Sequence, residues 1–426
     1  MALSAPQPAS RRARLPRRPV YAAALLLSFL PALAYVLLAW GDPVRGLNQV
    51  DTSCALLFCD YVTVYGPAAE RILADPAPAK GYLYPALFAL ATRPLALLGP
   101  ENALAAWGVL QAAGVLGLAA ATAWALPGPP LRRIVASGLL VGLCFPVYHN
   151  LKWGQVSTLV CALAIVALAL LRRNPTVSGV LLGLLGAVKV YPLYLAVAGL
   201  FRPSPRLIAG CAAALLVLVL LLPVAVMGVE GFTAFHAGVI EHVSGSADRL
   251  SRNMNPMAQL APNVWMRLTG NGPGGTTDLV RIAGLAVAAA SIGLSAALLR
   301  RDDGAAPQVV GFALLLQSLP FLGTPNWIHY FCYLPFCQLA LAANLPRLPG
   351  GVRHLAVAAV AASVALSSVV LRDLVGDWQA YGAAGVPFFS NLVLLAGQWL
   401  AAVALLAGGA RQSPPAPSSR IDQSGK

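Results

Sequence analysis

Asp60 is a residue of this sequence that could take part in acid–base chemistry. It stands in the stretch Cys59-Asp-Tyr-Val-Thr-Val-Tyr-Gly-Pro-Ala-Ala69, whose aromatic and β-branched residues predict a partly dry environment. A carboxylate gains basicity in such surroundings, so Asp60 could accept a proton as a general base. A carboxylate in a loop is more often simply solvated, and Asp51 and Asp75 compete for the role. The residues alone leave this choice open.

Lys189 is the strongest candidate for binding an anion. It lies in Gly186-Ala-Val-Lys-Val-Tyr-Pro192, between two apolar stretches. A lysine in that position needs an anionic partner, either a carboxylate or a phosphate. Membrane proteins also bind anions where helices are interrupted and their ends are exposed. The alternative is a lysine that reaches out of an apolar layer to the membrane surface.

Three further segments combine polar side chains with aromatic neighbours, which suits a sugar or a phosphate. The first, 149–155, is predicted as a short turn and carries His149, Asn150, Lys152, Trp153 and Gln155. The second, 249–259, carries Arg249, Arg252, Asn253, Asn255 and Gln259. The third, 325–330, is a predicted turn with Asn326 and with His329, which could titrate near neutral pH. Ordinary turns, solvated loops and interfacial anchors use the same residue types, so each segment also has a purely structural explanation.

The cysteines do not indicate a metal site. Five of the seven lie in or beside apolar stretches, where cysteine acts as a small hydrophobic residue. Cys54 and Cys59 share one predicted loop and could form a disulfide. No Cys/His spacing resembles a zinc site, and the sequence has neither a P-loop nor a GxGxxG fingerprint. We therefore expect neither a metal nor a cofactor.

The composition predicts an all-α, polytopic transmembrane protein. Of the 426 residues, 58% are hydrophobic and only 10% are charged, whereas a soluble domain carries about 25% charged residues. Apolar runs near the length that a helix needs to cross a bilayer recur along the chain. The alternation in segments of about ten residues that a β-barrel requires does not occur. The net charge of +14 is explained by basic cytoplasmic loops, so no nucleic-acid partner is expected.

About twelve membrane segments are predicted. Segment 175–201 is too long for one span and is broken at Tyr191-Pro192, so it is read as two short helices that dip into the membrane as a hairpin. The first span is read as an uncleaved signal anchor. The remaining segments are 21–40, 103–126, 134–149, 155–171, 207–228, 277–299, 307–322, 327–345, 354–371 and 386–408.

The positive charges predict which side each loop occupies. Eighteen of the 29 Lys and Arg residues would be cytoplasmic if both termini lie inside, as the positive-inside rule requires. Segment 83–98 then has to be an outer-surface or re-entrant element. The predicted organisation is a basic cytoplasmic tail at 1–19, one transmembrane domain at 20–408 and a disordered cytoplasmic tail at 409–426. Two long loops, at about 41–102 and 229–276, would lie outside, and loops of that size are usually functional.

The order of these motifs resembles glycosyltransferase family 87. The resemblance covers about residues 20–345, with Ser157 standing where an Asn is usual. The matching elements are Asp60 to Ala69, Tyr84-Pro85-Ala86, Asn150 to Ser157, Ala187 to Pro192, Asn253 to Pro256 and Pro325 to His329.

The resemblance implies a GT-C fold and an inverting, metal-independent transfer of a sugar, with mannose or arabinofuranose as the leading options. The implied donor is a polyprenyl-phosphate sugar and the implied acceptor is a glycolipid, both reached from the membrane lipids on the outer side of the cell membrane. Asp60 would be the base, and Lys189, His329 and Arg252 would hold the donor phosphate. The implied substrate-binding residues are Tyr65, Tyr84, Asn150, Gln155, Asn253, Asn255 and Asn326.

Two other functions are compatible with the predicted topology. A secondary transporter or flippase-like protein also has about twelve helices, but it should show internal repeats and ionisable residues near the membrane midplane. No convincing repeat is present, and the polar residues fall in the outer loops and turns. The other alternative is a non-catalytic scaffold of the cell envelope.

Overall fold

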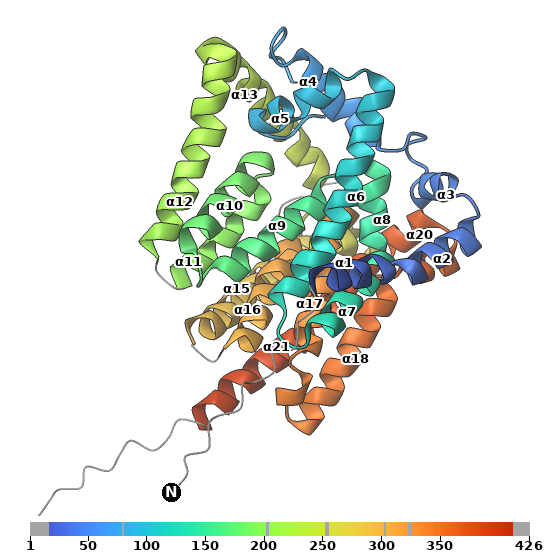
Figure 1. The fold of residues 1–426 in the computed structure, drawn as a ribbon, viewed down its shortest axis with the longest axis vertical. Helices are drawn as coiled ribbons and strands as arrows, with labels where there is room; N and C mark the ends of the chain where they lie inside the picture. Colours follow the sequence, from blue (N-terminus) through green and yellow to red (C-terminus); the bar gives the residue numbers. More distant parts are fainter. Residues whose placement is uncertain are drawn as a thin grey trace, which may run out of the picture.

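The computed structural model describes residues 17–78, 81–201, 204–251, 255–301, 304–322 and 326–411. Throughout these ranges the regular structure is helical, and the only β-structure is a pair of isolated bridges. The predicted all-α class is confirmed. Figure 1 shows the helices gathered into one body, with α4, α5 and α13 towards one end of its longest axis and the ends of α18 and α21 towards the other.

The helices follow one another closely along the chain. The first half contains α1 (Arg17–Leu27), α2 (Leu30–Trp40), α3 (Pro43–Val50), the π-helix η1 (Tyr61–Tyr65), α4 (Gly66–Arg71), α5 (Ala86–Ala96), α6 (Pro100–Ala125), α7 (Pro130–Leu143), α8 (Phe145–Trp153), α9 (Ser157–Leu170) and α10 (Pro175–Val188). The second half contains η2 (Tyr191–Val197), α11 (Ala198–Phe201), α12 (Pro205–Leu215), η3 (Leu216–Leu221), α13 (Leu222–Ser251), α14 (Ala261–Thr269), α15 (Thr276–Arg300), α16 (Ala305–Ser318), η4 (Leu319–Phe321), η5 (Ile328–Tyr333), α17 (Leu334–Ala342), η6 (Leu345–Arg347), α18 (Gly350–Leu366), α19 (Val369–Val375), α20 (Trp378–Ala383) and α21 (Val386–Arg411).

Five helical stretches of the described chain are long and apolar enough to cross a membrane. They are Pro19–Trp40, Pro100–Ala125, Pro205–Ser244, Thr276–Arg300 and Val386–Gly408. Six shorter apolar helices of 10–17 residues accompany them. The membrane character of the chain therefore follows from its helices, while the count of twelve segments stays a prediction.

The helix predicted over 134–149 is interrupted. Helix α7 ends at Leu143 and α8 begins at Phe145, because Cys144 is extended and forms an isolated bridge with Ser368. The amide of Phe145 donates to the carbonyl of Ser367 at 2.7 Å. A tertiary hydrogen bond thus replaces the helical one. Most of the turn predicted over 149–155 is helical, because α8 continues to Trp153.

Both long loops of the predicted topology contain helices. The first holds α3, η1, α4 and α5, and α5 is the element predicted at 83–98. Eleven residues are too few to span a bilayer, and several side chains of α5 are buried in the main hydrophobic core. In the second loop, α13 continues to Ser251 after a change of direction at Gly228, whose φ is +71°.

The break at Lys189 follows from local sequence. Helix α10 ends at Val188, and Pro192 follows Tyr191 in the first turn of η2. A residue that precedes proline is disfavoured in the α conformation, so the helix has to end before Tyr191. Helix α10 is fixed against α12 by close backbone approach. A Cβ added at Gly179 would lie 2.1 Å from the carbonyl oxygen of Leu207.

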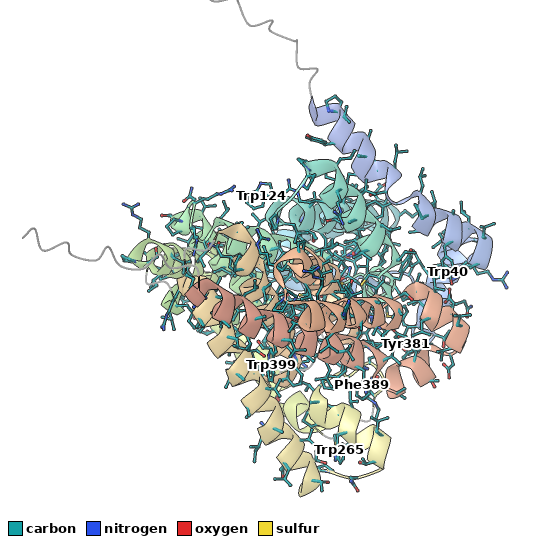
Figure 2. All side chains as sticks on the ribbon, turned by 90° about the horizontal axis from the view of Figure 1, so that it is seen from below. Trp40, Trp124, Trp265, Tyr381, Phe389 and Trp399 are labelled. Carbon is teal, nitrogen blue, oxygen red and sulfur yellow. A yellow bond between two sulfur atoms is a disulfide. The ribbon has the colours of Figure 1, made fainter. Side chains whose placement is uncertain are left out.

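Helix α14 and the N-terminal end of α15 project from the main body, whereas the rest of α15 packs in a second hydrophobic cluster. Figure 2 shows this yellow pair, with Trp265 of α14 labelled, well away from Trp40 at the end of α2. The connection between the two helices contains Gly270, Gly274 and Gly275, all with positive φ. The projecting pair forms one wall of the cavity described next.

Candidate active site

A cavity of about 850 Å³ brings together segments that are far apart in the sequence. Its walls come from residues near 60–84, 153–155, 189–191, 243, 255–284 and 320–330. Its volume lies in the upper part of the range that ligand pockets occupy. Seven of the predicted site residues line it, namely Asp60, Tyr65, Tyr84, Gln155, Lys189, Asn255 and His329.

Asp60 lies immediately before η1 and faces this cavity. Burial raises its pKa to about 6, although the hydrogen bond from Gln155 and the positive charge of Lys189 act in the opposite direction. A carboxylate with that pKa is ionised at neutral pH and is more basic than an exposed one. Asp60 can therefore accept a proton from a weakly acidic group such as a hydroxyl.

Gln155 connects the carboxylate to the lysine. Its side-chain Nε2 donates a hydrogen bond to Asp60 Oδ2. Its Oε1 accepts one from Lys189 Nζ at 2.9 Å and one from the Tyr84 hydroxyl at 3.1 Å. Gly154, in the left-handed conformation that ends α8, aims Gln155 into the cavity.

Lys189 is 3% exposed and its ammonium points into the same network. Besides Gln155, Nζ donates to Ser157 Oγ at 3.3 Å, and it lies 4.6 Å from the ring centroid of Tyr330. Among the described residues no carboxylate lies within ion-pair distance of Nζ. An ammonium has three N–H donors, so Lys189 keeps one for an anionic ligand.

Tyr65 and Tyr84 form the wall beside this network. Their hydroxyls are 2.8 Å apart and their rings meet edge to face at 5.3 Å. Both rings pack in the main core, so the hydroxyls are held at fixed positions. Two such hydroxyls beside an ammonium suit the hydroxyl groups of a sugar.

His329 lines the cavity with its ring almost fully buried. Neither ring nitrogen has a hydrogen-bond partner among the described residues. The ring stacks on His149 with 5.5 Å between centroids. His329 thus offers unused polar atoms to a ligand. Burial, and after it the positive charge of Lys189, hold the pKa of this imidazole well below its ordinary value, so the predicted titration near neutral pH is wrong.

Asp51 has a different environment from Asp60. It accepts hydrogen bonds from Trp153 Nε1 at 2.9 Å and from Ser53, and it lies 3.5 Å from His149 Nε2. Burial favours the neutral acid, but the nearby His149 ring and the hydrogen bonds from Ser53 outweigh it and lower the pKa of Asp51. Asp51 does not line the cavity, so Asp60 is the better placed base.

Asn150 is used inside the protein and does not line the cavity. Its Nδ2 donates to Gln111 Oε1 at 2.9 Å, and its Oδ1 accepts from the amide of Ser157 at 2.9 Å. Gln111 in turn donates to the carbonyl of Gln155. The predicted substrate contact is thus replaced by a supporting role in the turn that carries Gln155 and Ser157.

The remaining predicted residues either lie away from the cavity wall or fall outside the described residues. Asn326 is buried outside the cavity wall, and its Nδ2 donates to the carbonyl of Leu319 at 3.0 Å. Asp75 is exposed, and its carboxylate accepts from the amide of Ala77. Arg252 and Asn253 lie outside the described residues.

Several residues of the cavity were not singled out from the sequence. Tyr330 faces Lys189 but could not be told from an interfacial anchor by its type. Asp278 and Arg281 line the wall that α14 and α15 form, three positions apart at the start of α15. The sequence pattern could have identified both residues, because they are charged residues at the start of an apolar helix.

Part of the cavity rim is apolar and exposed. Leu83, Val190 and Val243 line the cavity and stay accessible, and Val190, the neighbour of Lys189, is 62% exposed. The cavity therefore offers a charged interior next to an apolar edge. This combination suits a ligand with a polar head and an apolar tail.

The comparisons with known proteins agree with this chemistry. Residues 82–325 match the model of glycosyltransferase family 87. The matched range includes Tyr84, Gln155 and Lys189, while Asp60 and His329 lie just outside it. No curated protein and no solved structure matches the chain. Because the matched range is more than half of the chain, this membrane protein belongs to glycosyltransferase family 87.

Proposed function

We propose that the protein transfers a hexose, with mannose as the first choice, from a polyprenyl-phosphate donor to an acceptor glycolipid. The observation that carries the proposal is the contact of one side chain, Gln155, with both Asp60 and Lys189. A displacement at a sugar carbon needs a base for the incoming hydroxyl and a positive charge for the departing phosphate. Asp60 and Lys189 supply these two groups at one cavity.

The proposed step is a single inverting displacement. Asp60 takes the proton of the acceptor hydroxyl while the acceptor oxygen bonds to the anomeric carbon. The bond between that carbon and the phosphate oxygen breaks, and the electron pair leaves with the polyprenyl phosphate. Lys189 and the ring of His329 would bind the departing phosphate oxygens. Tyr65, Tyr84 and Asn255 line the same cavity and would contact the transferred sugar.

The wall formed by α14 and α15 is assigned to the acceptor. Asn263, Asp278 and Arg281 line it. Carboxylate, amide and guanidinium groups are donors and acceptors that suit sugar hydroxyls. The apolar rim beside Lys189 is assigned to the isoprenoid chain of the donor.

The outer face of the cell membrane is the proposed location of the reaction. Cys54 and Cys59 form a disulfide one residue before Asp60. Disulfides persist in oxidising compartments and are rare in the cytosol. This agrees with the orientation that the Lys and Arg residues predict. A membrane-impermeant maleimide should label Asp75→Cys from outside and leave Arg353→Cys unlabelled in intact cells, and the reverse pattern would overturn the orientation.

The function is tested with membranes that contain the protein and a radiolabelled polyprenyl-phosphate mannose. Wild-type protein should move the label to glycolipid, and Asp60→Asn should reduce the rate by at least 100-fold. Asp75→Asn is the matched control, since Asp75 belongs to the same outer segment but is exposed. Full activity of Asp60→Asn would remove Asp60 as the base. Absence of transfer by wild-type protein from polyprenyl-phosphate mannose, glucose and arabinofuranose would remove the proposed reaction.

A further inference from the structure

Lys152 is a fully buried lysine whose ammonium is used entirely within the protein. Its Nζ donates to the carbonyl oxygens of Cys54 at 2.7 Å and Leu56 at 2.8 Å, and to Asn48 Oδ1 at 3.0 Å. Three acceptors match the three N–H donors of an ammonium. Since a buried charge is costly unless its hydrogen bonds are satisfied, these partners hold Lys152 and the segment around Cys54 firmly together.

The same segment is closed by the disulfide between Cys54 and Cys59. The ring that it forms contains Leu56 and ends one residue before Asp60. Within the ring, Phe58 has a φ of +57°, a conformation that bulky residues rarely adopt. Such a conformation persists only where surrounding contacts impose it.

The closed segment lies directly on the turn that carries Gln155. A Cβ added at Gly154 would lie 2.9 Å from Cα of Phe58, so the two backbones approach each other closely. The carbonyl of Gly154 accepts a hydrogen bond from Trp107 Nε1 at 3.2 Å, which anchors the turn from its other side. The residues from Lys152 to Gln155 therefore contact the segment that leads into Asp60 at successive points.

We propose that Lys152 and the Cys54–Cys59 disulfide form a clamp that positions Asp60 against Gln155. Lys152 is then a positioning residue, with no contact to substrate. The inference rests on the proposed role of Asp60 as the base. Opening the clamp leaves the cavity intact but lets the carboxylate move relative to the acceptor hydroxyl. A displacement of about 1 Å at a reacting group can cost on the order of 100-fold in rate.

The clamp can be opened chemically in the folded wild-type protein. The other five cysteines are free and buried, so dithiothreitol has one disulfide to reduce. Each Sγ gains an electron and a proton, and the reagent leaves as its cyclic disulfide. We expect kcat for transfer from radiolabelled polyprenyl-phosphate mannose to fall about 10- to 100-fold. The donor KM should stay within twofold, and reoxidation should restore the rate.

Two variants separate this effect from a general loss of structure. The double variant Cys54→Ser/Cys59→Ser should have a low kcat that dithiothreitol no longer changes. Lys152→Met, which keeps the length of the side chain but removes its donors, should lower kcat to a similar degree. In both, the acidic limb of the pH–rate profile should move to lower pH because Asp60 becomes more solvated. A reduced wild-type protein with unchanged kcat and an unchanged acidic limb would overturn the clamp.

Hydrogen–deuterium exchange tests the clamp without any substrate. Reduction should speed exchange of the backbone amides at 60–66 at least tenfold, while exchange in α10 and α12 stays the same. Equal exchange at 60–66 in the oxidised and reduced protein would reject the clamp. Because this measurement needs no transfer reaction, failure of the clamp and failure of the proposed glycosyl transfer give different results.

Discussion

The amide of Gln155 donates a hydrogen bond to the carboxylate of Asp60 across 95 positions of sequence. Its oxygen meanwhile accepts from the ammonium of Lys189. Gln155 thus couples a proton acceptor to a positive charge without placing the two in a direct ion pair. A direct pair would stabilise the carboxylate and make it a weaker base.

Gln155→Leu should lower kcat by about 10- to 100-fold, because Asp60 and Lys189 would lose the group that fixes their spacing. The measurement is steady-state transfer with the donor concentration varied. Gln155→Glu should be at least as damaging, since its carboxylate would repel Asp60 and pair with Lys189. A Gln155→Leu protein with wild-type kcat would show that the bridge has no role in the reaction.

The rate should depend on pH through Asp60. Its pKa is raised to about 6, and a general base works only when it is deprotonated. Then kcat/KM should be nearly constant above pH 7 and should fall about tenfold for each pH unit below 6. Initial rates between pH 5 and pH 8 give the profile. A rate that stays constant down to pH 5, as a base with the pKa of an exposed aspartate would give, would contradict this assignment.

Lys189→Met should reduce kcat by about 100- to 1000-fold, since removing one stabilising donor from a developing anion has that effect in enzymes. Lys189→Arg should recover part of the rate because the charge is retained. The position is tightly enclosed by Tyr330 and Gln155, so recovery should be incomplete. Equal rates for the Met and Arg variants would show that the charge is not what matters.

The acceptor wall can be tested separately from the donor site. Arg281→Ala should raise the acceptor KM by about tenfold, the loss expected when a charged hydrogen bond is removed. The donor KM should not change, because Arg281 belongs to the wall formed by α14 and α15, whereas Lys189 belongs to the network around Gln155. A variant whose donor KM rises instead would place Arg281 at the donor.

The packing of α10 on α12 makes a prediction about stability. Gly179→Ala should lower the free energy of unfolding by about 1–3 kcal/mol, because the added Cβ meets the backbone of Leu207 at 2.1 Å. Gly293→Ala is the matched control. Gly293 lies within α15 with open space around it, so alanine should stabilise by about 0.5–1 kcal/mol. Thermal unfolding in detergent compares both variants with the wild type.

The sequence was sufficient to predict the helical class, the break near Lys189 and seven of the residues that line the cavity. These predictions depend on local features: apolar runs, a proline after a tyrosine, and polar residues at the ends of apolar segments. The role of Asn150 could not be predicted, because an amide in a turn looks the same whether it contacts a ligand or supports its neighbours. The interruption at Cys144 depends on Ser367 and Ser368, which are more than 220 residues away in the sequence. No local sequence pattern predicts it.

Lys189 and Val190 place an ammonium and an exposed isopropyl group on either side of one peptide bond. A donor that binds here must have an anionic group and an apolar group within a few ångströms of each other. A nucleotide sugar fails this requirement, since its base and ribose would come to lie against the apolar edge with their hydrogen bonds unmade. Under the proposed function we therefore expect the entrance to discriminate against water-soluble nucleotide sugars before any sugar ring is recognised. Free isoprenoid phosphate should then compete with the donor more strongly than a nucleoside diphosphate does.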